Sequence, residues 1–250
     1  QGDIIIQTDA DCVMGSKWIE TIINEFNTGN IGFVCGASPI ISKNVILNEF
    51  YLLDSIAQDA FGASCIMMNF PLTCTGRNIA FTKKAFNEVN GYENISTIIS
   101  GDDDLLLHKI SNNTKYQTKF CLELDGIVES EGPNSITHFI NQRSRWASKS
   151  MLYYALDSSS IELKLILPFI FLVNLFCIVS IIKFIQFPSF YLLLPWIIKS
   201  ISDIFIIKQF MVFFKYKFTF IYFFIISLLH PIYIIIFAII GPIMKIKWKA

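Results

Sequence analysis

The sequence lacks three features that would each point to a different class of protein. Its six cysteines form no CxxC pair, which argues against a zinc site and favours a reduced domain that faces the cytosol. Its basic residues are spread between apolar stretches and form no patch for nucleic acid, which we exclude as a partner. Acidic residues are scarce in residues 161–250, which contain only two. What remains is a chain whose second part has the composition of a membrane segment.

The formal net charge of zero hides two oppositely charged parts. Residues 1–160 carry 11 basic and 18 acidic residues, a net charge of −7, whereas residues 161–250 carry 9 and 2, a net charge of +7. The first part can bury a globular core. The second is apolar with a basic fringe, which suits an anionic cytoplasmic leaflet. We therefore predict a globular domain over residues 1–160 and a membrane region over residues 161–250.

Three apolar stretches in the second part are long enough to cross a membrane. Residues 165–182 and 218–244 carry no charge, and residues 184–207 carry only Lys199 and Asp203. These two are four residues apart, so we expect them to pair, as charges inside a membrane usually do. We predict two to three transmembrane helices surrounded by membrane lipid.

The positive-inside rule places two basic clusters on the cytoplasmic side. They are Arg143, Arg145 and Lys149 before the first stretch, and Lys208, Lys215 and Lys217 before the third. Three full crossings would leave Lys245, Lys247 and Lys249 outside. Either one stretch is re-entrant or interfacial, or the basic tail departs from the rule. We predict a multi-pass protein of the cell membrane whose first domain is cytoplasmic.

The chain opens on an apolar run that ends in two acids. Ile4-Ile5-Ile6 predicts a buried strand of the kind found in parallel sheets. Asp9 and Asp11 follow it, where open α/β sheets bind ligands. Carboxylate oxygens suit Mg²⁺ or Mn²⁺ held against a diphosphate, although many such pairs are ordinary turns.

Apolar periodicity predicts alternating helices and strands, and hence an α/β fold. Helices are expected over residues 16–27, 45–68 and 83–89, the last capped by Thr82, and a further helix begins at Ser135. Strands are expected over residues 31–35 and 119–128, and a loop over residues 129–135. His108 and His138 are expected to be surface or helix residues without a ligand.

Two polar segments in the first part are candidates for a site. Gly76 would let the backbone approach a ligand, with Arg77 and Asn78 as polar contacts beside it, or the segment is a plain turn. Asp102, Asp103 and Asp104 precede an apolar helix. The helix dipole accounts for one or two acids at that place better than for three, so one of them is a candidate general base.

The segment Gln142-Arg143-Ser144-Arg145-Trp146 joins the two parts. At helical spacing, Gln142, Arg145 and Trp146 lie on about one turn. An Arg fork suits phosphate oxygens, and an indole ring suits a sugar face or a membrane interface. The alternative is a basic and aromatic anchor at the start of a membrane segment.

The order of four motifs before an apolar tail resembles that of membrane-bound family 2 glycosyltransferases. The motifs are DxD (residues 9–11), TGRNIAF (75–81), GDDD (101–104) and QxxRW (142–146). These glycosyltransferases include cellulose synthase, hyaluronan synthase and ceramide glucosyltransferase. The resemblance implies a GT-A fold, inversion at the anomeric carbon, a nucleotide-sugar donor and a lipid or polysaccharide acceptor. It makes Asp11, with Asp9, the ligand of Mg²⁺ or Mn²⁺ and of the donor diphosphate.

The resemblance also implies roles for the later motifs. Gln142 and Arg145 would steady the diphosphate, and Trp146 would border the acceptor. The family's Glu-Asp pair is replaced here by consecutive aspartates. The best alignment makes Asp103 the base, and a shift of one residue makes it Asp102.

In the family, strands that hold the nucleobase come before the DxD strand. This sequence starts at the DxD strand and has no counterpart of them. We therefore expect a partial GT-A domain, the C-terminal portion of a longer enzyme, which by itself would not bind donor. The alternatives are a catalytically inactive, membrane-anchored binding or scaffold fragment, and a metal-dependent phosphotransferase. The second gives no reason for QxxRW.

Overall fold

The computed structural model describes residues 2–93, 95, 101–150, 152–156 and 159–244. The basic tail of Lys245, Lys247 and Lys249 lies outside these residues. The chain forms two compact units, Gln1–Gly132 with Asp157–Glu162, and Pro133–Leu156 with Leu163–Ala250. The predicted boundary was residue 160, whereas here the segment that carries QxxRW groups with the apolar helices. The predicted fold class, α/β followed by apolar helices, is confirmed.

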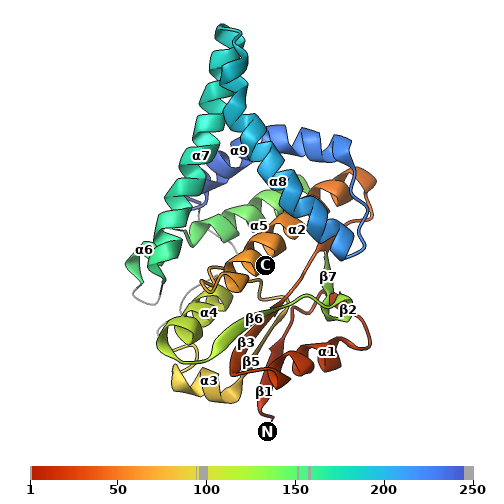
Figure 1. Ribbon diagram of the computed structural model, residues 1–250, viewed down its shortest axis with the longest axis vertical. Helices are drawn as coiled ribbons and strands as arrows, with labels where there is room; N and C mark the ends of the chain where they lie inside the picture. The colour runs from red at the N-terminus through yellow and green to blue at the C-terminus, as the bar shows by residue number, and fades with distance from the viewer. Residues whose placement is uncertain (1, 94, 96–100, 151, 157–158, 245–250) are drawn as a thin grey trace. The chain divides into compact units, whose positions relative to one another are not determined.

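The first unit is built on a four-stranded sheet in the order β1 (Ile4–Gln7), β5 (Ile79–Thr82), β3 (Ile31–Gly36) and β6 (Gln117–Cys121) (Figure 1). β3 and β6 are parallel, and the other two pairs are antiparallel. The prediction of a buried parallel strand at residues 4–6 is therefore wrong in its setting. β1 is an edge strand of this sheet. Ile4 and Ile6 pack against buried residues on one face, whereas Ile5 lies on the other face and is 37% exposed.

A three-stranded sheet adjoins it, in the order β2 (Cys12–Met14), β7 (Val128–Glu131) and β4 (Ile40–Ile41). The predicted strand over 119–128 and the loop over 129–135 are corrected here. β6 ends at Cys121 and is followed by the short helix η2 (Leu124–Gly126), which interrupts the predicted strand. The strand β7 comes next. The partners of β7 are β2 and β4, which lie far away in the sequence, so the local pattern could not show this pairing.

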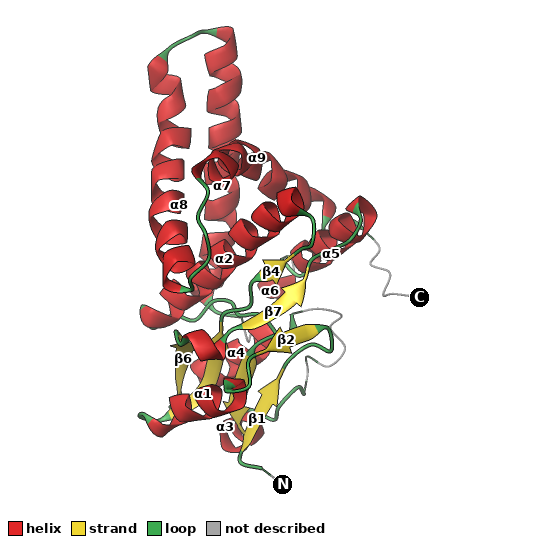
Figure 2. Cartoon of the chain, turned by 90° about the vertical axis from the view of Figure 1, so that its right-hand side faces the viewer, coloured by secondary structure: helices red, strands yellow, loops and turns green. Residues whose placement is uncertain are grey.

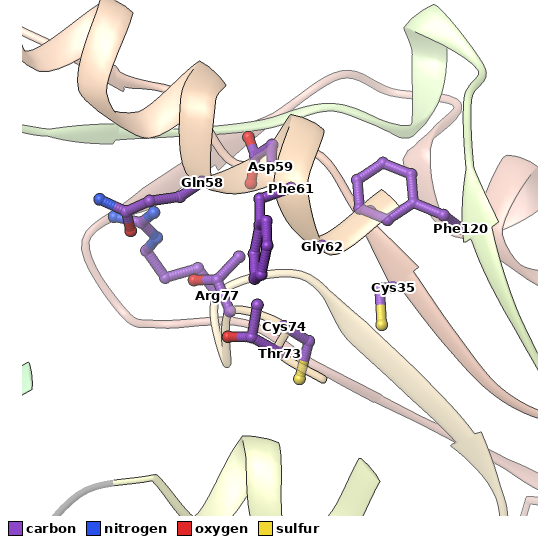
Figure 3. A pocket seen from close by; sticks show the side chains of 11 residues that line it. Cys35, Gln58, Asp59, Phe61, Gly62, Thr73, Cys74, Arg77 and Phe120 are labelled. Carbon is purple, nitrogen blue, oxygen red and sulfur yellow. The ribbon is translucent and has the colours of Figure 1, made fainter. Parts of the chain in front are cut away.

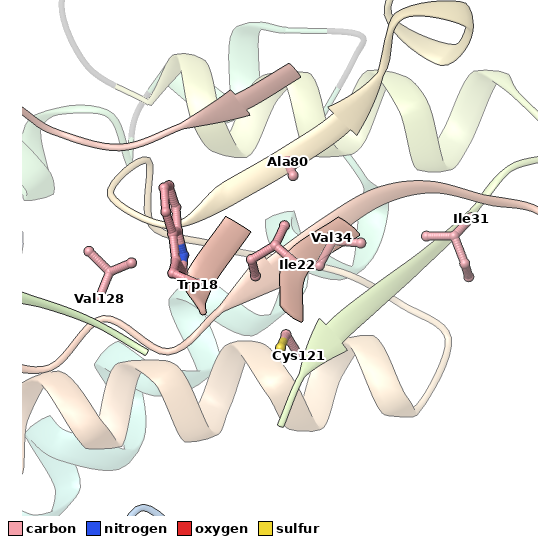
Figure 4. Close-up of a cluster of buried hydrophobic side chains, with 7 residues drawn as sticks. All are labelled: Trp18, Ile22, Ile31, Val34, Ala80, Cys121 and Val128. Carbon is pink, nitrogen blue, oxygen red and sulfur yellow. The ribbon is translucent and has the colours of Figure 1, made fainter. Parts of the chain in front are cut away.

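Helices cover the sheets of the first unit. They are α1 (Trp18–Asn24) with η1 (Glu25–Asn27), α2 (Val45–Met67), α3 (Lys83–Glu88) and α4 (Asp102–Asn113). The predicted cap of α3 is confirmed, because Thr82 Oγ1 accepts a hydrogen bond from the Ala85 N–H at 3.1 Å. A buried apolar cluster joins α1 to the strands (Figure 4), and its members are Trp18, Ile22, Ile31, Val34, Ala80, Cys121 and Val128.

The second unit consists of helices. They are α5 (Ile136–Ser148), α6 (Leu152–Ala155), α7 (Ile161–Gln186), η3 (Phe190–Leu193), α8 (Leu194–Phe213) and α9 (Phe220–Ile240). Three spans in this part of the chain are long and apolar enough to cross a membrane, namely Ile161–Gln186, Phe190–Phe213 and Phe220–Ile240. α7 and α8 are connected at one end and form a helical hairpin (Figures 1 and 2).

Two prolines inside the apolar helices release backbone carbonyls that other elements then satisfy. Pro168 has no N–H for the Lys164 carbonyl, which instead accepts the Tyr154 hydroxyl at 2.9 Å. Pro231 likewise releases the Ser227 carbonyl, which accepts Trp196 Nε1 at 3.0 Å. Such substitution is needed in lipid, where an unsatisfied carbonyl is costly.

The predicted pairing of Lys199 with Asp203 is confirmed. Lys199 Nζ also lies 3.3 Å from His230 Nδ1, so the same ammonium group links α8 to α9. The charge of this lysine is therefore neutralised within the second unit, as a cation in so apolar a helix requires.

Candidate active site

The DxD acids lie in the turn between β1 and β2. The Cys12 N–H donates to the Asp9 carbonyl at 3.2 Å, which closes the turn. Asp9 and Asp11 are both exposed. This places two carboxylates at the carboxyl end of β1, where a ligand can reach them.

The TGRN segment lies next to that end of β1. Gln7 pairs with Ile79 in the register of β1 and β5, so the start of β5 adjoins the end of β1. A Cβ atom added to Gly76 would lie 3.2 Å from Asp103 Oδ2 and 3.5 Å from Gln7 Nε2. Gly76 therefore occupies a narrow gap between β1 and the acids of α4, and its lack of a side chain permits this approach.

The three acids at the start of α4 differ in their surroundings. Asp102 is exposed, Asp103 is half-buried and Asp104 is 2% exposed. Asp103 Oδ2 accepts the Gly76 N–H at 2.7 Å. Asp104 Oδ1 accepts the Cys74 N–H at 2.8 Å and the Thr73 hydroxyl at 2.9 Å. Two of the three carboxylates thus bind the segment that leads into β5.

Arg77 is held by groups of its own unit. Its Nη1 donates to Ser130 Oγ at 3.1 Å, and its Nη2 donates to the Ser38 carbonyl at 2.9 Å. The guanidinium therefore ties the TGRN segment to the β3–β4 connection and to β7. That positioning role was not predicted from the sequence.

Asn78 is 1% exposed and forms a second internal junction. Its Nδ2 donates to the carbonyls of Ala37 and Gly126 at 2.9 and 2.8 Å. Its Oδ1 accepts Trp18 Nε1 at 3.1 Å. Both amide hydrogens therefore remain within the protein, and Asn78, just before β5, joins α1, η2 and the β3–β4 connection.

The QxxRW residues lie on α5 in the second unit. The helix begins as predicted, because Ser135 Oγ accepts the His138 N–H at 3.1 Å. Gln142, Arg145 and Trp146 are half-buried. Because they belong to the other unit, their sharing a site with the acids stays a prediction.

Arg143, which the sequence predicted only as part of a basic cluster, is buried at 2% exposure, next to Ser144 at 1%. Its guanidinium lies 4.3 Å from the Trp146 ring centre and 5.3 Å from that of Phe139. Phe139 in turn packs against Tyr233 and Phe237 of α9. One face of Trp146 is thus occupied by a cation, which fixes the ring on the helix.

One group of side chains in the described part of the chain could hold a metal ion by distance. Ligand atoms of Cys74, Asp103 and Asp104 lie within 4.8 Å of one another. Burial raises the pKa of the Cys74 thiol well above its ordinary value, and the Cys35 thiol and the two carboxylates raise it further. This donor set fits Mg²⁺ or Mn²⁺ poorly, since those ions prefer oxygen ligands. The exposed carboxylates of Asp9 and Asp11 fit better.

Tyr92 is a neighbour of the acids that sequence reasoning missed. Its hydroxyl donates to Gln7 Oε1 at 3.1 Å. Burial raises the pKa of Tyr92 to about 12, and the carboxylates of Asp102 and Asp103 add to this. The phenol therefore stays neutral at physiological pH. The only signal in the sequence was its position after the Asn90-Gly91 turn.

A cavity of about 100 Å³ lies beside the TGRN segment, between α2 and the ends of β3 and β6 (Figure 3). Asp59 lines it and is 6% exposed. Its Oδ2 accepts the Ser38 N–H at 2.8 Å. Burial raises the pKa of Asp59 from 3.8 to about 7, against the opposing effects of the Ser38 N–H and the Arg77 charge.

This shift makes the stability of the first unit depend on pH. The folded protein keeps the Asp59 proton to about pH 7, whereas the unfolded chain releases it near 3.8. The stabilising contribution is therefore complete below that lower value and is lost as pH rises through about 7. We expect the thermal unfolding midpoint of the detergent-solubilised protein to decrease as the pH is raised from about 5 to about 7.5. The decrease should be smaller in Asp59→Asn. Asp54→Asn, on the same helix, is the control, and equal pH dependence in all three proteins would contradict the assignment.

Comparison with known proteins places these features in a family. A search of curated proteins found no match to the chain. The sequence model described as "Glycosyl transferase family group 2" matches residues 4–244, which is nearly the whole chain. The chain belongs to glycosyl transferase family group 2 and is a glycosyltransferase.

Proposed function

We propose that the protein transfers a sugar, with inversion, from a nucleotide-diphosphate donor to a lipid or growing polysaccharide acceptor at the cytoplasmic membrane face. The observation that supports this is the meeting of three motifs in the first unit. The DxD end of β1, Gly76 and the acids of α4 adjoin one another. In a glycosyltransferase, such a place can bring donor diphosphate and acceptor hydroxyl together.

The proposed reaction is one displacement. A carboxylate of α4, Asp103 or Asp102, takes the proton of the acceptor hydroxyl while that oxygen bonds to the anomeric carbon. The bond from this carbon to the diphosphate oxygen breaks, and its electron pair stays on the diphosphate. Attack from the face opposite the leaving group inverts the configuration.

The donor diphosphate would be bound by side chains from both units. Asp9 and Asp11 would hold a Mg²⁺ or Mn²⁺ ion, which would supply positive charge to the leaving group. The Arg145 fork and the Gln142 amide would contact its oxygens. Gly76 brings Asp103 close to the end of β1 that carries the DxD turn, and Trp146 would border the acceptor.

The α7–α8 hairpin supports the proposed orientation. Two crossings by these helices would return the chain to the side from which it entered the membrane, and would put Lys208, Lys215 and Lys217 on the same side as the cations of α5. By the positive-inside rule that side is cytoplasmic. Nucleotide-sugar donors would then reach the catalytic unit, and a lipid acceptor would reach it from the leaflet.

The test is a transfer assay on the complete protein in membranes. We expect release of nucleoside diphosphate from one member of a panel of nucleotide-sugars, and only when membrane lipid or an oligosaccharide is present. NMR of the product should show an anomeric configuration opposite to that of the donor. Retained configuration, or activity that remains in the supernatant after carbonate washing, would contradict the proposal.

A further inference from the structure

The first turns of α4 fasten the segment before β5 at three successive points. His108 Nε2 lies 2.8 Å from the Leu72 carbonyl, which can only accept, so this nitrogen carries the proton. Asp104 binds Thr73 and Cys74, and Asp103 binds Gly76. We call residues 72–76 together with these three contacts the latch.

The latch is buried and charge-assisted. His108 is fully buried and Asp104 nearly so. Hydrogen bonds to an ionised acceptor are about twice as strong as neutral ones, and more so away from water. Residues 72–76 are therefore held firmly against α4 rather than forming an adaptable loop.

The latch sets the spacing between the two ends of the proposed site. Gly76 lies between Asp103 and Gln7, and Gln7 is the last residue of β1 before the DxD turn. Asn78 and Arg77 then fix the following residues to β7 and the β3–β4 connection. The distance from the DxD turn to the start of α4 is thus determined by this segment.

The same contacts separate the roles of the acids. Both oxygens of Asp103 accept backbone N–H groups, from Gly76 at 2.7 Å and from Asp104 at 2.9 Å. Such bonds favour the ionised form of a carboxylate and make it a poorer proton acceptor. Asp102 is exposed and, within the described part of the chain, accepts no hydrogen bond.

We propose that Asp102 is the general base and that Asp103, Asp104 and Thr73 are positioning residues that hold the latch. This rests on the proposed glycosyl transfer. Asp102 takes the proton of the acceptor hydroxyl, whose oxygen bonds to the anomeric carbon as the diphosphate departs with the electron pair. The other two acids stay ionised throughout and bind backbone N–H groups.

The catalytic half is tested by kinetics on the complete protein. Asp102→Asn should lower kcat by about 10²–10⁴-fold and keep the affinity for nucleoside diphosphate. Asp103→Asn retains an oxygen that can accept the Gly76 N–H and loses the acceptor of the Asp104 N–H, so its kcat should fall much less than that of Asp102→Asn. Formate should restore part of the turnover of Asp102→Ala, because a small carboxylate can enter an exposed site, and should not restore Asp103→Ala. If Asp103→Asn loses most of its kcat and Asp102→Asn remains active, the assignment of the base is overturned. The proposed function still stands in that case, provided that the wild-type protein transfers sugar.

The positioning half has a readout that does not need turnover. Thr73→Val removes one bond to Asp104 with little change of shape, and Thr75→Val in the same segment is the matched control. Amide hydrogen exchange at Cys74 and Gly76 should accelerate in Thr73→Val and not in the control, and Thr73→Ser should restore protection. In the transfer assay, Thr73→Val should lower kcat and leave nucleotide affinity unchanged. Unchanged exchange at both amides in Thr73→Val would overturn the latch.

Discussion

Asp11→Asn is expected to abolish sugar transfer while the protein still folds and enters the membrane. Asp11 is exposed in the turn after β1, so its replacement breaks no packing. The asparagine keeps the size of the side chain and removes the charge that a divalent ion needs. Stabilisation of a leaving group by a metal amounts to several kcal/mol, which corresponds to a loss of roughly 10³-fold or more.

The control for this experiment is Asp3→Asn, an exposed acid just before the opposite end of the same strand. It should transfer sugar at the wild-type rate. EDTA should inhibit wild type, and Mg²⁺ or Mn²⁺ should restore it, whereas neither ion should rescue Asp11→Asn. Normal turnover in Asp11→Asn together with resistance to EDTA would remove the metal from the proposal.

The sequence predicts well those elements whose cause is local. α2, α3 and α5 have clear periodicity and a capping side chain close by, as at Thr82 and Ser135, and all three form. The three apolar spans and the Lys199–Asp203 pair follow from hydropathy and helical spacing in the same way. Local chemistry suffices wherever the partners are within about one helical turn.

Sheet pairing is where the prediction from sequence is wrong. The apolar run of β1 is typical of a buried parallel strand, yet β1 is an antiparallel edge strand. Residues 129–131 of β7 were expected to lie in a loop, because Gly132-Pro133 follows them and the partners β2 and β4 are distant. Strand neighbours are set by tertiary contacts that no local window contains.

The motif residues show a third kind of limit. A motif marks a place in the chain and does not say which atoms face a ligand. Arg77 and Asn78 were predicted as ligand contacts, and their hydrogen bonds to Ser38, Ser130, Ala37 and Gly126 give them a structural role. Three adjacent aspartates look alike in a sequence, and their burial and hydrogen bonds in the structure distinguish Asp104 from Asp102.

Arg145→Ala is expected to weaken both the donor and the released nucleotide. A hydrogen bond to a charged group contributes about 1.5–3 kcal/mol, so affinity for nucleoside diphosphate should fall by roughly ten- to a hundredfold. Turnover at low donor concentration should fall at least as far, because the same cation would meet the charge that grows on the leaving diphosphate. Asp102→Asn, by contrast, should lose turnover alone.

The control has to separate a specific contact from the general charge of α5. Lys149→Ala removes a half-buried cation at the carboxyl end of the same helix. Arg143 cannot serve, because its guanidinium is buried against Trp146 and Phe139, and its loss would disturb the packing of α5. Titration with nucleoside diphosphate should therefore show a large loss of affinity for Arg145→Ala and near wild-type binding for Lys149→Ala. Equal losses in both variants would mean that α5 attracts the donor only by its net charge. Unchanged binding in Arg145→Ala would place the diphosphate contact elsewhere in the protein.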